Sequence, residues 1–189
     1  ARRGAEELAA HLNRVYDALI AQVEHYGGSI VGFAGDAITC WFSGNDSAVR
    51  AVVCGTALLE AMRGVGQIIL PDGGYLLLGL KVAVTSGTTK RYAVGDPAIQ
   101  LIDILAGEPI VRLAAGEELA ERDELLIDAP TVRQLGEAVS VREWRGSSEE
   151  RFAVLESFPT PLNLRSPALD EVTVPDEIQI GRASCRERV

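Results

Sequence analysis

The chain has 189 residues, of which 47% are hydrophobic and 24% are charged. This length allows one domain of ordinary size plus a tail, and the apolar fraction excludes a disordered chain or a low-complexity fibre. With 18 Lys and Arg against 27 Asp and Glu, the net charge is -9. An acidic chain repels polyanions, so we expect neither a nucleic-acid partner nor binding to an anionic membrane surface. A small phosphate ligand stays compatible with this charge.

The cysteine pattern predicts a reducing environment. Cys40 and Cys54 stand in apolar runs as small buried hydrophobes, and with Cys185 they form no disulfide framework. A cytoplasmic location follows. No apolar run approaches the roughly 18 residues of a membrane span. The first residue is not Met and no signal peptide is visible, so we expect a piece of a longer protein.

The C-terminal end differs from the rest of the chain. Residues 180–189 have no apolar period and resemble a translated sequencing adapter; a natural basic C-terminus is the alternative. The prolines Pro159, Pro161, Pro167 and Pro175 predict a linker over 158–179. The predicted domain therefore covers residues 1–157.

Hydrophobic periodicity predicts the elements of the first half. Residues 5–26 form an amphipathic helix whose apolar stripe is Leu8, Leu12, Val15, Leu19 and Val23. Two short strands, 29–33 and 37–42, are separated by three residues and form a hairpin. A second helix covers 47–63, with Asp46 as its N-cap.

The second half mixes strands and helices. A turn at 71–74 leads into a long apolar run, 75–85, which predicts a central strand. A strand at 90–94 follows, and Gly95-Asp96-Pro97 opens another helix. We further expect a helix over 109–121, a strand over 124–127, a short helix over 130–135 and strands over 139–144 and 152–156.

The order of these elements favours an α+β fold. Strands alternate with helices, but several strands are hairpin neighbours, which is typical of a mixed or antiparallel sheet with helices mainly on one face. A doubly wound parallel sheet would need a crossover helix between every pair of strands.

Three stretches together resemble the class III adenylate/guanylate cyclase catalytic domain. They are residues 26–42, with a Gly-Gly break and a hairpin that carries Gly-Asp; residues 80–87; and residues 92–101 through 125–128. The third stretch is most similar to bacterial relatives of soluble adenylyl cyclase. The resemblance covers about residues 4–157 and implies a ferredoxin-like sandwich that converts ATP into cyclic AMP and pyrophosphate with Mg²⁺ or Mn²⁺.

The resemblance implies a metal site at the first hairpin. Asp36 matches the second metal-binding aspartate of the family, and Gly35 lets phosphate and metal approach the backbone. Two divalent ions held by carboxylates can lower the pKa of the attacking hydroxyl and stabilise the leaving group. The alternative is that Asp36 is a turn residue, because Asp is favoured in turns.

Two cations are further candidates. Lys81 stands where the family carries an Arg or Lys that contacts the triphosphate; alternatively it reaches the sheet edge as a solvated side chain. Arg112 is a possible anion-binding residue, since an Arg of the corresponding helix helps to bind bicarbonate in the subfamily. Its alternative is a surface Arg paired with the acidic stretch 117–124, which we expect to be a solvated helix face.

The sequence departs from the family pattern at several positions. The family's first strand, with its first metal aspartate, is missing, and Gly32 replaces a Lys common in adenylate-type members. Val111 and Ala115 stand where an ungapped alignment places the catalytic Asn and Arg. These departures imply the metal-supplying half of a site shared with a second cyclase domain, in tandem or as a dimer, and inactivity of this fragment alone.

Two other functions stay open at this point. A degenerate cyclase half could bind a nucleotide or small anion and regulate a neighbour, as Val111 and Ala115 favour. An α+β domain without any nucleotide is the third hypothesis. The choice between ATP and GTP is not predicted, because the selecting residues belong to the partner.

Overall fold

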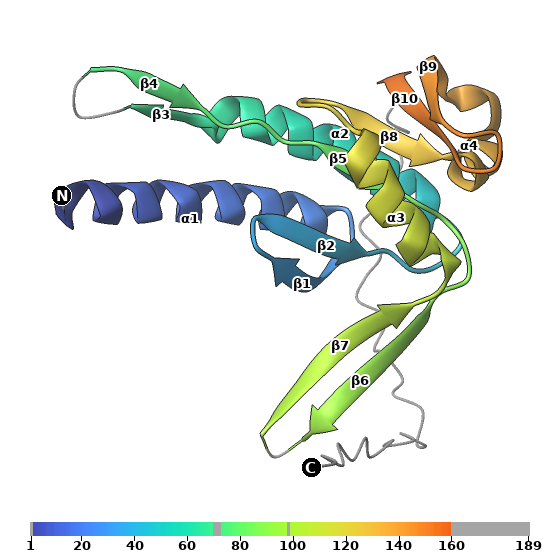
Figure 1. The fold of residues 1–189 in the computed structure, drawn as a ribbon, viewed down its shortest axis with the longest axis horizontal. Coiled ribbons are helices and arrows are strands. Elements are labelled where there is room, and N and C mark those ends of the chain that lie inside the picture. The colour runs from blue at the N-terminus through green and yellow to red at the C-terminus, as the bar shows by residue number, and fades with distance from the viewer. Residues whose placement is uncertain (1, 70–72, 98, 160–189) are drawn as a thin grey trace, which may run out of the picture.

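The computed structural model describes residues 2–69, 73–97 and 99–159, with the side chains of 2–5 left aside (Figure 1). The predicted linker and adapter lie outside these residues, apart from positions 158 and 159, and the predicted turn at 71–74 lies partly outside them. No helix in the described part of the chain is long and apolar enough to span a membrane.

The first half confirms the predicted helix–hairpin–helix order. The elements are α1 (Arg2–His25), β1 (Ser29–Ala34), β2 (Ala37–Trp41) and α2 (Ser47–Val65). The strands β1 and β2 pair antiparallel, from Ser29 opposite Trp41 to Ala34 opposite Ala37. The two long helices pack together through Val15 and Leu19 of α1 and Met62 of α2, which form one buried cluster.

A four-stranded mixed sheet forms the core of the second half. Its order is β5-β8-β10-β9, with β5 parallel to β8 and the other pairs antiparallel. The bounds are β5 (Val82–Val84), β8 (Leu125–Asp128), β9 (Ser140–Gly146) and β10 (Arg151–Ser157). This mixed sheet confirms the α+β class and the predicted strands at the C-terminal end of the domain.

Alternate residues of β8 face different helices. Leu125 and Ile127 pack with α2 and with α4 (Ala129–Leu135), which is followed by a 3-10 turn, η1 (Gly136–Ala138). Leu126 faces the other way, toward Phe152 and α3 (Glu108–Leu119). Because side chains alternate along a strand, four consecutive buried residues require cover on both faces.

The predicted long strand at 75–85 is wrong. Its residues divide between β4 (Tyr75–Leu77), which pairs antiparallel with β3 (Gln67–Ile69), and β5 of the central sheet. Between them the chain passes Gly79, where a Cβ atom would collide with the Arg122 side chain. The continuous apolar run predicted burial that β4 does not have, because Tyr75, Leu76 and Leu77 are exposed, and it did not show with which strand each part would pair.

The predicted helix start at 95–97 is also wrong. β6 (Lys90–Asp96) and β7 (Gln100–Ala106) form an antiparallel hairpin that projects from the body of the domain (Figure 1). Gly95 has a φ of +136°, and a Cβ atom there would collide with the carbonyl oxygen of Gln100. Asp96 ends β6 opposite Gln100, and Pro97 follows in the turn of the hairpin. Gly, Asp and Pro are favoured in turns as well as at helix starts, which is why the sequence predicted a helix here.

The capping prediction for α2 needs a correction as well. Asp46 precedes the helix as predicted but makes no side-chain capping hydrogen bond. Its carboxylate instead accepts a hydrogen bond of 2.9 Å from Nε of Arg50, one turn further on. A strong charged donor at the i+4 position thus replaces the backbone amide as its partner.

The two described cysteines are free thiols, Cys54 buried and Cys40 half-buried. Burial raises the pKa of Cys40 to about 11. Burial, and then the neighbouring Cys40, raise the pKa of Cys54 to about 12. Both thiols are therefore protonated near neutral pH. Cys54 is a small core residue as predicted, whereas Cys40 is half-buried and not buried as predicted.

Candidate functional site

Asp36 lies in the tight turn between β1 and β2 and is exposed. Gly35 before it has a φ of +64°, a conformation that glycine adopts without strain, and a Cβ atom built there would meet nothing within 4 Å. The backbone at this turn is therefore open to approach by a ligand. The hairpin places the Asp36 carboxylate in solvent, with no neighbouring side chain crowding the turn at Gly35.

The turn offers only part of a metal site. No group of three or more His, Cys, Asp or Glu side chains that could hold a metal gathers within residues 2–69, 73–97 and 99–159. Mg²⁺ is usually held by one or two carboxylates together with phosphate oxygens and water. Asp36 thus fits as one ligand of a metal–triphosphate complex, and the other ligands would come from the nucleotide, water or groups outside the described residues.

The hairpin that carries Asp36 rests on the C-terminal half of α1. Phe33 of β1 meets the ring of Tyr16 edge-on, with 5.8 Å between the ring centroids. β1 also approaches β7 near the projecting hairpin. The turn therefore lies beyond the part of the hairpin that is packed.

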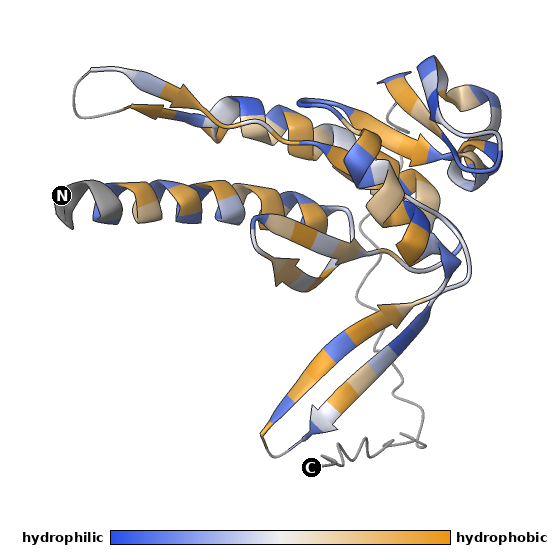
Figure 2. Cartoon of the chain, in the orientation of Figure 1, coloured by the Kyte–Doolittle hydropathy of each residue, from blue (hydrophilic) through white to orange (hydrophobic). Residues whose placement is uncertain are grey.

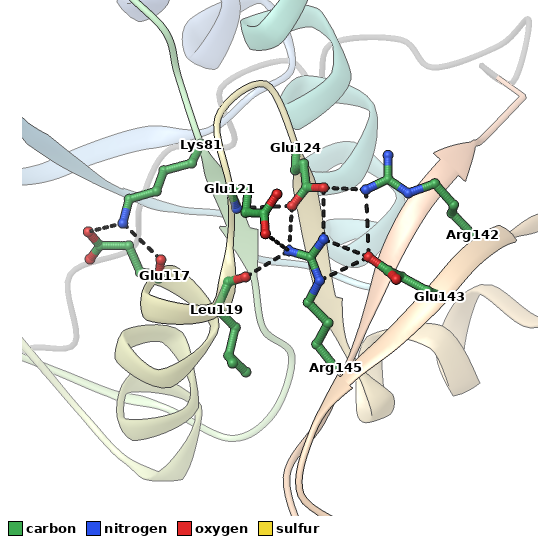
Figure 3. A network of polar contacts seen from close by, with 8 residues as sticks. All are labelled: Lys81, Glu117, Leu119, Glu121, Glu124, Arg142, Glu143 and Arg145. Atoms are coloured by element: carbon green, nitrogen blue, oxygen red, sulfur yellow. Dashed lines mark hydrogen bonds and ion pairs between the residues drawn. The ribbon is translucent and has the colours of Figure 1, made fainter.

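Lys81 lies just before β5 and is directed toward the end of α3 (Figure 3). Its Nζ donates a hydrogen bond of 2.9 Å to the carbonyl oxygen of Glu117 and lies 3.5 Å from Oε1 of the same residue. A cation near the C-terminus of a helix is favourable because the last carbonyls there carry partial negative charge. The side chain is 43% exposed, so it remains accessible to solvent.

Arg112 is buried, contrary to its alternative as a surface residue paired with the acidic stretch. Its Nε donates to Asp128 at 2.9 Å, Nη2 donates to the carbonyl oxygen of Ser86 at 2.8 Å, and Nη1 pairs with Glu108 at 2.7 Å. The Asp128 side chain is almost fully buried and also accepts from the Thr131 amide. This network joins the ends of β5 and β8 to α3.

The three candidates do not meet. Within the described residues, no hydrogen bond or ion pair joins any two of Asp36, Lys81 and Arg112. A hollow of about 180 Å³ lies at the end of α2 and touches none of them. Its lining comprises Met62, Arg63, Gly66, Gln67, Leu77, Leu78, Arg122 and Asp123.

The predicted solvated face at 117–124 is wrong at its last residue. α3 ends at Leu119, and the Glu124 side chain is only 8% exposed. Arg145 binds its carboxylate with two hydrogen bonds, of 2.7 and 3.0 Å, and Arg142 also donates to it (Figure 3). Arg145 additionally donates to the Leu119 carbonyl at 2.9 Å and so closes the end of α3.

The environment of Glu124 lowers the pKa of its carboxyl group. Burial alone would raise this pKa, but hydrogen bonds from Arg145, the Glu121 amide and Arg142 stabilise the carboxylate and outweigh burial. The charge is therefore part of the folded structure, in which it ties β8 to β9.

Sequence reasoning missed Arg50, whose buried side chain binds the carbonyl oxygens of Tyr26, Gly27 and Ser43. One signal was present, an Asp and an Arg four residues apart at the start of a helix. The carbonyl partners could not be found in this way, because they depend on how the chain turns before β1 and after β2.

Comparison with known proteins identifies the fold of the chain. Neither a scan against protein-family models nor a search of the curated proteins finds a match. Among solved structures, the guanylyl cyclase Cya2 superposes with a TM-score of 0.72 at 22% identity, over 85% of this chain and 86% of that one. The chain has the fold of a class III nucleotide cyclase catalytic domain.

Two more structures of this cyclase fold are similar over most of their length. The adenylyl cyclase CyaB from P. aeruginosa has a TM-score of 0.64 at 18% identity, over 82% of this chain and 86% of that one. A non-canonical dimeric guanylyl cyclase domain of the RhoGC fusion protein from the aquatic fungus Blastocladiella emersonii has a TM-score of 0.68 at 14% identity, over 82% of this chain and 85% of that one. The cyclase fold that the sequence predicted is thus confirmed.

The Glu124 network predicts a pH dependence of stability. Because the folded pKa is lowered, the contribution of this carboxylate is complete above the ordinary pKa of Glu, about 4.3, and is lost as the pH falls through the lowered value. Glu124→Gln should therefore be less stable than the wild type near pH 6, with a difference that narrows toward about pH 3. Urea unfolding at each pH measures both curves.

Glu118→Gln is the matched control. Glu118 is exposed on α3, so this substitution removes the same charge at a position outside the Glu124 network. Its curve should follow that of the wild type. Parallel curves for wild type and Glu124→Gln would show that Glu124 carries no such contribution.

Proposed function

We propose that this chain supplies the metal-binding half of an adenylate cyclase active site, which converts ATP into cyclic AMP and pyrophosphate when a second cyclase domain is paired with it. The observation that carries the proposal is the exposed Asp36 beside the open backbone of Gly35, on a hairpin of a cyclase-type fold. ATP is proposed as the nucleotide because residues 92–101 through 125–128 are similar to bacterial relatives of soluble adenylyl cyclase, while the residues that select the base would belong to the paired domain.

The reaction is an in-line displacement at the α-phosphorus. The 3′ oxygen of the nucleotide forms a bond to phosphorus and loses its proton, while the bond to the pyrophosphate oxygen breaks. A bound Mg²⁺ or Mn²⁺ would favour the ionised hydroxyl and stabilise the charge on the phosphate oxygens. Asp36 would hold that ion, and Gly35 leaves the turn open to the triphosphate.

Lys81 would add a positive charge beside the triphosphate. Its Nζ is held by Glu117 at a distance of 3.5 Å and is partly exposed, so the exchange of one anionic partner for another needs little rearrangement. An anion at Arg112 would have to displace Glu108, the exposed one of its two carboxylate partners. The Arg112 assignment therefore does not enter the proposed mechanism.

The substrate and the two free thiols of the described residues favour a cytoplasmic setting.

The projecting β6–β7 hairpin supports pairing with a second cyclase domain. Large apolar side chains are exposed along it, and a soluble monomer rarely exposes so many together (Figure 2). They are Tyr92, Val94, Ile99, Leu101, Ile102 and Ile104. A second domain of the same fold is the proposed occupant, since a solved domain with this fold forms a dimer, which is described as non-canonical.

A regulatory module is the second candidate. Val111, which aligns with the catalytic Asn of the family, is 65% exposed and has no polar group to offer a substrate. A protein of this kind would bind nucleotide or a small anion without turning it over. The assay below separates it from the enzyme.

Asp36→Asn should lower cyclic nucleotide formation by at least about 100-fold, because the amide does not replace a charged metal ligand. The chain is assayed together with its paired cyclase domain, with Mn²⁺ and equal ATP and GTP, and mass spectrometry identifies the products. Chelation of the metal should abolish the wild-type reaction, and cyclic AMP should dominate.

Asp17→Asn is the control for the charge, because Asp17 is exposed on α1 and is not part of the hairpin turn. Full activity of Asp36→Asn would refute the metal assignment. Metal-dependent stabilisation by an ATP analogue, without any product from the wild type, would favour the regulatory module.

Ile102→Lys should weaken domain pairing by at least about tenfold, because a charge would be buried in an apolar interface. Sedimentation velocity over a concentration series measures the association. Ile69→Lys is the control, since Ile69 is 78% exposed on a different hairpin. Weaker pairing of the Ile69 variant alone would place the interface elsewhere.

A further inference from the structure

Arg50 is a charged residue in a place that costs free energy. Its side chain is 3% exposed, on the face of α2 that also buries Val53 and Cys54. Moving a guanidinium out of water costs several kcal/mol unless hydrogen bonds satisfy it. The groups around Arg50 therefore have to compensate for its burial.

The partners of Arg50 come from both ends of the β1–β2 hairpin. Nη1 donates to the carbonyl oxygens of Tyr26 at 3.1 Å and Gly27 at 2.9 Å, just before β1, and Nη2 donates to that of Ser43, just after β2. Nε is held by Asp46 at 2.9 Å. One side chain thus joins the end of α1, both roots of the hairpin and the start of α2.

Arg50 and its four hydrogen-bonding partners form what we call the clasp, and the packing around it restricts the two ends of the hairpin where the chain enters β1 and leaves β2. The Arg50 guanidinium lies 5.9 Å from the ring centroid of Phe42, within the range of a cation–π contact. A Cβ atom at Gly28 would lie 2.5 Å from that ring and 2.9 Å from Val23. The residues before β1 and after β2 are therefore closely packed beside Arg50.

The hairpin packs on α1 and approaches β7, but none of the other described strands hydrogen-bonds with it. In the described part of the chain, β1 and β2 pair only with each other. A strand of six residues spans about 20 Å, so a rotation of about 10° at the roots moves the turn by roughly 3 Å. Metal ligation tolerates displacements of only about 0.2 Å. The position of Asp36 is thus sensitive to how firmly the roots are held.

We infer that Arg50 is a positioning residue: its guanidinium clasps the two roots of the β1–β2 hairpin and thereby sets the position of the Asp36 carboxylate. The metal-binding part of this inference rests on the proposed function. The structural part does not, because it concerns only how the hairpin is held.

The structural part is tested by hydrogen exchange on Arg50→Lys. An ammonium group keeps the charge but cannot reach the carbonyls on both sides with the geometry of a guanidinium. Exchange of the β1–β2 amides should accelerate at least about tenfold, while the β8 and β10 amides keep their rates. Arg63→Lys is the matched control, because Arg63 is an exposed arginine of the same helix.

Asp46→Asn provides a milder second variant if Arg50→Lys folds poorly. Asp46 is 56% exposed, and the Asn amide oxygen can still accept the hydrogen bond from Nε of Arg50, so the substitution removes one charge from the clasp and leaves the three carbonyl partners of Arg50 in place. It should accelerate exchange of the hairpin amides alone, by less than Arg50→Lys. Unchanged hairpin exchange in both variants, or equal acceleration in β8 and β10, would overturn the clasp.

The functional part is tested in the paired enzyme by titration with Mn²⁺. Arg50→Lys should raise the Mn²⁺ concentration for half-maximal rate at least about tenfold, and saturating Mn²⁺ should restore most of kcat, since the ligand is present but misplaced. Asp36→Asn should not be restored by metal. A kcat loss in Arg50→Lys that Mn²⁺ does not restore would overturn the positioning role.

The two failures can be told apart. If the wild type makes no product, the proposed function fails, while the exchange rates still decide whether Arg50 holds the hairpin. If the exchange rates do not change but Asp36→Asn is inactive, the clasp fails and the metal assignment stands.

Discussion

The β1–β2 hairpin is held at its base by one buried guanidinium, and the candidate chemistry stands at its opposite end. Arg50 has hydrogen-bonding partners before β1, after β2 and at the start of α2. These bonds offset the cost of burying its charge, and they define where the hairpin leaves the helices. The Asp36 carboxylate in the open turn would be held in place for a metal only if the other end of the hairpin is fixed.

Periodic patterns in the sequence predicted the elements whose apolar residues recur at a fixed spacing. The four-residue and three-residue spacings from Leu8 to Val23 predicted α1, and the short gap between two apolar runs predicted the β1–β2 hairpin. In both cases the decisive information lies within a few neighbouring residues. Patterns of this kind are local, and so they are legible without knowledge of the rest of the fold.

Pairing between distant segments was less accessible. The run 75–85 looks uniform in sequence, but its first part pairs with β3 and its last part with β8. Gly95-Asp96-Pro97 could begin a helix or lead into the turn of a hairpin. In the structure the apolar residues 100–106 that follow form β7, which pairs with β6. Such choices depend on which partner strand is available, which composition does not reveal.

The site shows the same division. Asp36 could be found because a turn and a family resemblance both mark it, and the structure places it in an exposed turn. Burial of Arg112 and Glu124 could not be predicted, because their partners Asp128 and Arg145 lie in other elements. Acidic stretches are usually solvated, but Arg142 and Arg145 of β9 bind the carboxylate of Glu124 and make it an exception.

The central claim is that the turn at Asp36 binds a divalent cation beside a triphosphate. The most direct measurement is the broadening of backbone amide signals by paramagnetic Mn²⁺ in the presence of a non-cyclising ATP analogue. We expect the broadening to be strongest at Gly35, Asp36 and Ala37 and to be lost after Asp36→Asn. Sharp signals at this turn, with broadening at another acidic surface, would contradict it.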